Sequence, residues 1–217
     1  HDYDWAVSGG HPKGRLEDKH LYRYGFNANV FARRTRVEEP SAAISVLVDQ
    51  SGSMSGEKIE AARKAAYTLC EAMTDVERLN FELLGFTGDV PGRRGNIVYV
   101  FKGFGEPWSA GRARIGSMHA IRQNYDAAAV RIASKRLMAQ PQKRRALIVL
   151  SDGYPAPENP ERLLQVVPTV ERQHVVIGIG IMSEAVSKFY RRYVVLQSED
   201  QLLGTLVKAV RFAVEAR

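Results

Sequence analysis

The sequence has one cysteine and no long apolar run. Cys70 stands alone among 217 residues, so no disulfide can form within the chain and no zinc site can be built from cysteine pairs. No apolar stretch approaches the roughly 20 residues that a membrane-spanning helix needs. The first residues, His1 to Trp5, are polar and aromatic and have no signal-peptide character. Together these absences predict a cytoplasmic protein that does not enter a membrane.

Several catalytic motifs are missing as well. There is no Gly-x-x-x-x-Gly-Lys-[Ser/Thr] loop, so we do not expect the chain itself to hydrolyse ATP. There is no His-Glu-x-x-His zinc motif. A catalytic triad would need His119 or His174 beside a serine such as Ser51, and no nucleophile elbow supports that arrangement. The pair of glycines at 178 and 180 lies inside an apolar run and lacks the third glycine of a dinucleotide loop.

The composition is that of one globular domain with an excess of positive charge. Hydrophobic residues make up 45% and charged residues 25% of the chain, which suits a protein with a full core. The net charge is +7, and the basic residues cluster at 33–36, 93–94, 112–114 and 143–145. Such clusters are compatible with a solvated surface, an acidic protein partner or nucleic acid. No aromatic residues interleave with them, so nucleic acid is the least favoured of the three.

The pattern along the chain predicts an α/β fold. Residues 1–37 form a polar lead-in segment, and residues 38–217 form the compact domain. In this domain, strand patterns alternate with helical patterns, which favours a mostly parallel, six-stranded, Rossmann-like sheet with helices on both faces. A short connection near residues 88–95 makes one short edge strand antiparallel. The expected strands lie at 42–49, 80–86, 96–101, 146–151 and 174–181, with a last strand ending near 195. The expected helices lie at 55–74, at 127–138, from 160 onward, and from 198 to about 216, and Pro168 should kink or end the third of them.

Oxygen-bearing side chains follow two of these strands. Asp49, Ser51 and Ser53 occupy alternate positions after the first strand, and Asp152 follows the strand at 146–151. In the usual 3-2-1-4-5-6 strand order, the first and fourth strands are neighbours, so Asp49 and Asp152 come together at one edge of the sheet. Hydroxyl and carboxylate oxygens suit Mg²⁺ or another divalent cation such as Mn²⁺ or Ca²⁺.

A third loop can complete this site. The long irregular stretch at 102–124 leads to Asp126, which would close one side of the cation. Octahedral coordination then leaves one position for water or for an incoming carboxylate. Three carboxylates packed together without a cation would repel one another and raise a pKa. The alternative is that the aspartates only cap helices and that the serines are turn residues.

These loops resemble a known family. Asp-x-Ser-x-Ser after an apolar strand resembles the metal-ion-dependent adhesion site (MIDAS) of von Willebrand factor A (VWA) domains. From about Phe31 onward, the chain is similar to the C-terminal VWA domain of the T subunit of aerobic cobaltochelatase, the CobT type, and to phage-encoded relatives. One departure is Ala127, where the family usually has glycine; if that backbone needs a positive φ, the loop must differ. The segments that carry the resemblance are 48–59, 84–87, 101–108, 124–126 and 147–155.

The resemblance implies a protein that binds other proteins. We expect a non-catalytic partner of a MoxR-type AAA+ ATPase, which together would drive Co²⁺ insertion into a corrin ring by a large chelatase subunit during cobalamin biosynthesis. The cation would accept an acidic side chain of a partner. Two alternatives remain: a phage or bacterial VWA adaptor of an AAA+ ATPase outside cobalamin synthesis, and a hydrolase that uses the cation to activate water. The sequence offers no second metal cluster and no clear general base for the hydrolase.

Overall fold

The computed structural model divides the chain into two compact units, His1–Glu39 and Pro40–Arg217. In the first unit, β1 (Asp4–His11) and β2 (Arg15–Leu16) both pair antiparallel with β3 (Phe31–Val37). The expected lead-in segment therefore contains a small sheet of its own. The structure describes residues 4–11, 15–16, 31–37, 42–90, 93–155, 160–197 and 204.

The second unit is built on a six-stranded sheet with the order β6-β5-β4-β7-β8-β9. Numbered from the first strand of this unit, the order is 3-2-1-4-5-6, as the sequence predicts. All neighbours are parallel except β5 and β6, which pair antiparallel at one edge. The predicted fold class is confirmed. The strands are β4 (Ala42–Asp49), β5 (Leu79–Val90), β6 (Arg93–Lys102), β7 (Arg144–Ser151), β8 (Val175–Ile181) and β9 (Tyr193–Leu196).

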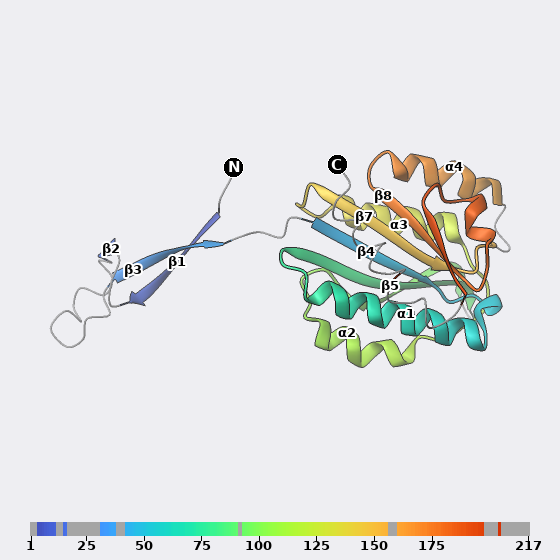
Figure 1. Ribbon diagram of the computed structural model, residues 1–217, viewed down its shortest axis with the longest axis horizontal. Helices are drawn as coiled ribbons and strands as arrows, with labels where there is room; N and C mark the ends of the chain where they lie inside the picture. The colour runs from blue at the N-terminus through green and yellow to red at the C-terminus, as the bar shows by residue number, and fades with distance from the viewer. Residues whose placement is uncertain are drawn as a thin grey trace. The chain divides into compact units, whose positions relative to one another are not determined.

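Helices cover both faces of this sheet (Figure 1). Helices α1 and α2 pack on one face, and α3 and α4 on the other. Among the described residues, no helix combines the length and the apolar character that crossing a membrane requires. The predicted helix at 198–216 lies outside the described residues, apart from Gly204. The helices are α1 (Glu57–Thr74), α2 (Trp108–Arg114), α3 (Asp126–Met138) and α4 (Pro160–Glu171), with short 3₁₀ turns η2 (Gly52–Met54), η3 (Ile115–Ser117) and η4 (Ala185–Lys188).

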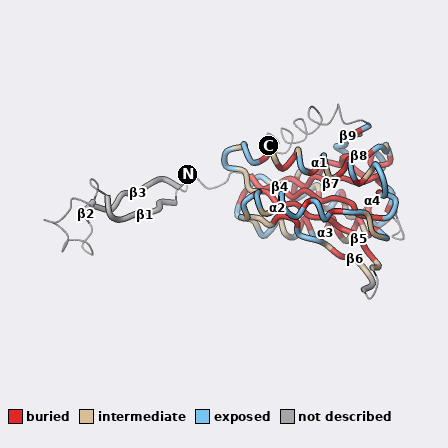
Figure 2. Tube along the Cα trace, turned by 90° about the horizontal axis from the view of Figure 1, so that it is seen from below, coloured by how far each residue is buried: buried red, intermediate tan, exposed pale blue. Residues whose placement is uncertain are grey.

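The central strand β4 is buried along its whole length (Figure 2). Successive side chains of a strand point to opposite faces of the sheet. Accordingly, Ile44, Val46 and Val48 join the core under α1, whereas Ala43 and Leu47 join the core under α3 and α4. Because both faces need apolar side chains, the strand reads as a continuous apolar run. This double burial fixes the position at which β4 ends, and thereby the position of Asp49.

The edge hairpin is longer than the sequence predicts. β5 extends to Val90 and β6 has 10 residues, so most of the expected turn at 88–95 is strand, and the antiparallel edge strand is not short. The pairing register shifts between Gly88 and Val90, where Asp89 has a φ of 48°. The Asp89 carboxylate accepts a hydrogen bond from the backbone N–H of Gly95, itself at φ 88°. A bulge therefore accommodates the turn-forming residues without ending the strands.

Two helix predictions also need correction. The stretch at 102–124 is not wholly irregular, because it contains α2 and η3. A Cβ on Gly111 would lie 2.6 Å from the Trp108 ring, so this glycine serves close packing of α2 and not a loop. Pro168 does not end its helix, since α4 continues to Glu171. Proline and glycine weaken helices, but tertiary packing can override that preference.

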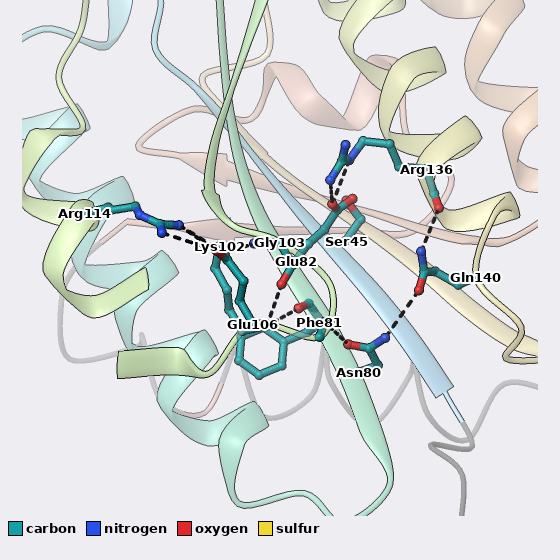
Figure 3. Close-up of polar contacts among 11 residues, drawn as sticks. Ser45, Asn80, Phe81, Glu82, Lys102, Gly103, Glu106, Arg114, Arg136 and Gln140 are labelled. Atoms are coloured by element: carbon teal, nitrogen blue, oxygen red, sulfur yellow. Dashed lines mark hydrogen bonds and ion pairs between the residues drawn. The ribbon is translucent and has the colours of Figure 1, made fainter. Parts of the chain in front are cut away.

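Charged side chains are buried beside β5 (Figure 3). The Glu82 carboxylate has no exposed surface; it accepts hydrogen bonds from Ser45 at 2.8 Å and from Nε of Arg136 on α3 at 2.8 Å. Lys102 of β6 is also buried, and its ammonium donates to the carbonyl oxygens of Phe81 and Gly103. Burial raises the pKa of Glu82 and lowers the pKa of Lys102. These contacts tie the edge hairpin to β4 and α3.

Candidate metal centre

The carboxyl ends of β4 and β7 lie side by side. These strands pair in parallel up to Val48 and Leu150, so Asp49 and the Ser151–Asp152 segment follow at the same edge of the sheet. The Ser151 hydroxyl donates a hydrogen bond of 2.8 Å to Oδ2 of Asp49. The strand order thus brings together two segments that are about a hundred positions apart, with a sequence separation of 102 for this contact.

Asp49 is fully buried at the centre of this arrangement. Its Oδ1 accepts the backbone N–H of Ser51 at 2.8 Å, and its Oδ2 accepts the Ser151 hydroxyl. Burial raises the pKa of Asp49 to about 6 because it disfavours the charged form. The hydrogen bonds from Ser51 and Ser151 act in the opposite direction, and the negative charge of Asp152 adds to the increase. The surroundings of Asp49 therefore stabilise its charged form less well than water does.

The serines of the first loop lie next to each other. Ser51 is buried and Ser53 is exposed, and their hydroxyl oxygens are 3.0 Å apart. A hydrogen bond from outside the loop holds the residue between them, because the backbone N–H of Gly52 donates to the carbonyl of Arg122 at 2.6 Å. A Cβ at position 52 would lie 3.2 Å from that carbonyl oxygen. The small residue lets the first loop approach the segment before α3.

Asp152 has one paired and one unpaired carboxylate oxygen. Its Oδ2 lies 2.9 Å from Nζ of Lys58 in the first turn of α1. Its Oδ1 is buried and has no hydrogen-bond partner among the described residues. Gly153 follows with a φ of 91°, and a Cβ there would lie 2.6 Å from the backbone nitrogen of Val186. Only glycine fits this turn, which sets the direction in which Asp152 leaves the strand.

The third loop supplies a hydrogen-bonding side chain, Asn124, and a buried carboxylate, Asp126. Asn124 donates from Nδ2 to the carbonyl of Tyr154 at 2.9 Å and, over a longer 3.5 Å, to Oδ2 of Asp49. Asp126 is buried at the first position of α3. Burial raises the pKa of Tyr190, and the negative charges of Asp126 and Asp49 raise it further. Both carboxylates therefore lie within electrostatic reach of the same buried ring.

The alanine after Asp126 does not disturb this loop. Ala127 lies inside α3, and it is not among the described non-glycine residues with positive φ, which are Arg78, Asp89 and Met182. The backbone at 127 is helical, so a glycine is not required there.

Sequence reasoning missed three residues of the site. Asn124 and Ser151 hydrogen-bond to the Asp49 carboxylate, and Lys58 pairs with Asp152. Asn124 and Ser151 each lie within two residues of a predicted ligand, which is the signal that could have found them. The sequence did not indicate a role for Lys58 at the site, because the helical pattern places this residue on the polar side of α1. It reaches the site only through tertiary packing.

The donors present fit a hard divalent cation. Within the described residues, no group of three or more His, Cys, Asp and Glu side chains is arranged to hold a metal by itself. The candidate site instead combines two adjacent carboxylates, a pair of serine hydroxyls and an orphaned buried oxygen on Asp152. Such an oxygen-only set, completed by water, is the environment that Mg²⁺ prefers. The assignment of Asp49, Ser51, Ser53, Asp126 and Asp152 as ligands stays a prediction.

The two candidate catalytic histidines are engaged elsewhere. The Nε2 of His174 lies 2.9 Å from the Ser134 hydroxyl, under α3, and a His119 ring nitrogen contacts the carbonyl of Ser117. Neither contacts Ser51 or Ser53 through a described hydrogen bond. Neither His119 nor His174 therefore forms with Ser51 or Ser53 the described serine–histidine pair that hydrolysis by a triad requires.

The strand order and the loops at its switch point define the class of VWA domains, and solved structures share the fold. A pilus adhesin, SpaC from Lactobacillus rhamnosus GG, superposes with a TM-score of 0.64 at 17% identity, covering 82% of this chain. The SpRpn10 VWA domain has a TM-score of 0.58 at 17% identity and covers 80% of this chain and 95% of that domain. A von Willebrand factor type A structure from Catenulispora acidiphila has a TM-score of 0.62 at 14% identity, covering 98% of this chain and 50% of that chain.

These similarities establish the fold alone, and this chain spans only 31% of the length of SpaC. The sequence identifies the branch. The chain belongs to the family described as the cobalamin biosynthesis protein CobT VWA domain, whose model matches residues 30–105 and 89–213. The resemblance to the CobT-type VWA domain is thereby confirmed.

Proposed function

We propose that this chain is a metal-ion-dependent protein-interaction domain of a CobT-like subunit. It would work in the cytoplasm with a MoxR-type AAA+ ATPase, and with a large chelatase subunit, in Co²⁺ insertion during cobalamin biosynthesis. The observation that carries the proposal is a buried Asp49 that is hydrogen-bonded to the Ser51 and Ser151 loops and lies within electrostatic reach of Asp152, in a member of the CobT VWA family.

The residues of the chain have separate tasks in this proposal. Asp49 and Asp152, with Asp126 at the side, provide negative charge, and Ser51 and Ser53 provide neutral hydroxyl ligands. Asn124 and Ser151 hold Asp49 in place through hydrogen bonds. A bound Mg²⁺ would supply a coordination position for an acidic side chain of the partner. Because Ser53 is exposed, a carboxylate can reach this position from solvent.

A pull-down with a purified MoxR-type ATPase tests the proposal. We expect capture in the presence of Mg²⁺ and loss of capture with a chelator or in Asp152→Asn, since the amide keeps the shape but removes the charge. Glu184→Gln, an exposed carboxylate outside the predicted ligand set, serves as the control and should leave capture unchanged. Capture that persists in Asp152→Asn and in chelator would refute a metal-bridged contact.

The same experiment addresses the role outside cobalamin synthesis. Adding the large chelatase subunit to the mixture shows whether the captured complex extends to it. An ATPase that binds without that subunit would favour an adaptor, bacterial or phage-encoded, for another AAA+ machine.

A further inference from the structure

Lys58 contacts the candidate metal centre from outside the predicted ligand set. It belongs to the first turn of α1, whereas Asp152 follows β7, and the two lie 94 positions apart. Their side chains are 33% and 6% exposed, respectively, so the ammonium approaches a buried carboxylate from the solvent side. The ion pair occupies one carboxylate oxygen and leaves the other, Oδ1, without a hydrogen-bond partner among the described residues.

We infer that Lys58 is a positioning residue for the cation: it holds Oδ2 of Asp152 so that Oδ1 remains the ligand oxygen. This inference rests on the proposed function, because it concerns the same site. Carboxylates that bind metals are themselves usually held by hydrogen bonds, and loss of such a contact typically weakens metal binding about 10–100-fold. A carboxylate with one oxygen paired and the other buried and unpaired matches this arrangement.

Lys58 also adjusts the charge of the site toward an acidic partner. With Asp49, Asp126 and Asp152 ionised, the carboxylates exceed a divalent cation by one negative charge, which would repel an incoming carboxylate. The ammonium of Lys58 cancels this excess without occupying a coordination position. The site then presents a cation to solvent in surroundings that are neutral overall, and an acidic side chain can enter without repulsion.

Calorimetric titration of the whole chain with Mg²⁺, and separately with Mn²⁺, tests this role. We expect Lys58→Met to bind the cation about tenfold more weakly than the wild type. Lys58→Arg keeps both the charge and the donor, and it should restore binding to within about threefold of the wild type. Lys64→Met removes the same charge from an exposed position further along α1 and serves as the matched control. The melting temperature without metal is measured for all three variants, because Lys58→Met removes the ion-pair partner of a buried carboxylate and its effect on stability must be separated from its effect on cation binding.

The outcomes separate the two levels of the argument. Weaker binding in Lys58→Met, rescued in Lys58→Arg and absent in Lys64→Met, supports the positioning role. Binding in Lys58→Met that equals or exceeds wild-type binding overturns it, while the proposed metal site stands. If the wild type binds neither ion, both the positioning role and the proposed function fail. If Lys58→Met does not fold, Lys58→Ala provides the same comparison.

Discussion

At the scale of single residues, Asp49 is the position where folding and function conflict. Folding buries its carboxylate completely, which raises its pKa to about 6. A carboxylate with this pKa is mostly ionised at neutral pH, where it can bind a cation, but keeping its charge buried costs free energy. Hydrogen bonds from Ser51 and Ser151 help to keep the charge, but they do not offset the burial. A divalent cation would, because it adds positive charge directly to the carboxylate oxygens.

We predict that the metal-free protein loses stability as the pH rises from about 4 to about 6. An unfolded aspartate titrates near 3.9, so within this window the folded state holds a proton that the unfolded chain has released. Stability is therefore highest below the window and falls as Asp49 ionises, by on the order of 3 kcal/mol. Urea unfolding in the presence of a chelator, at a pH of about 4 and of about 7.5, measures this difference.

The variant Asp49→Asn isolates the contribution of this group from that of the other carboxylates. Asparagine cannot ionise, so the variant should gain stability relative to the wild type as the pH increases. Parallel pH profiles for the two proteins would show that Asp49 is not the group responsible.

At the scale of secondary-structure elements, an ion pair between a buried glutamate and a partly exposed arginine joins β5 to α3 (Figure 3). Glu82 has no exposed surface, and Nη2 of Arg136 lies 2.7 Å from its Oε2. A second hydrogen bond from Ser45 links the same carboxylate to β4. Helix α3 begins at Asp126, so the contact that anchors this helix to the sheet also supports the loop that delivers a predicted ligand.

We predict that Arg136→Met destabilises the protein by about 1–3 kcal/mol, because the buried Glu82 carboxylate keeps the Ser45 hydrogen bond but loses its ion-pair partner. Equilibrium unfolding in urea gives this value. The double variant Glu82→Met, Arg136→Met should recover much of the loss, since it removes both charges. Arg131→Met, an exposed arginine of α3, is the control and should shift stability by less than about 0.5 kcal/mol. Equal losses in the two single arginine variants would rule out this ion pair as the cause.

At the scale of the whole molecule, the chain consists of two compact units that meet at Glu39 and Pro40 in sequence. Every predicted metal ligand and every described contact between them lies in the second unit. Its fold is shared with proteins as different as a pilus adhesin and the SpRpn10 VWA domain. The fold therefore does not identify the partner, and specificity must come from the loops and side chains around the site.

We predict that residues 40–217 fold without the first unit and keep the cation site. Their melting temperature without metal should lie within about 4 °C of the whole chain, which corresponds to a change of about 1 kcal/mol or less. Their Mg²⁺ affinity by calorimetry should also match that of the whole chain. Loss of cooperative unfolding in this fragment would show that the first unit is part of the same folding unit.

The general form of the fold could be predicted because it depends on local patterns. Continuous apolar runs such as Ala42–Asp49 predict strands that are covered on both faces, and the alternation with helices predicts the parallel order. The extent of the edge hairpin could not be predicted, because a bulge at Asp89 keeps turn-forming residues within strands. Helix α2 was missed because Gly111 reads as a loop residue until its contact with Trp108 is seen.

By itself, the sequence determined the carboxyl ends of β4 and β7, the order of the sheet and the oxygen-rich loops at Asp49 and Asp152. These depend on period, burial and residue type, which are properties of neighbouring positions. Only the tertiary structure decided which side chains support those loops. Asn124 and Ser151 lie beside predicted ligands in the sequence, but only the structure shows that both hydrogen-bond to Asp49, and nothing in the local spacing relates Lys58 to Asp152. Contacts across the sheet arise from packing in three dimensions. Local sequence patterns therefore indicate candidate residues but do not specify which of them contact one another.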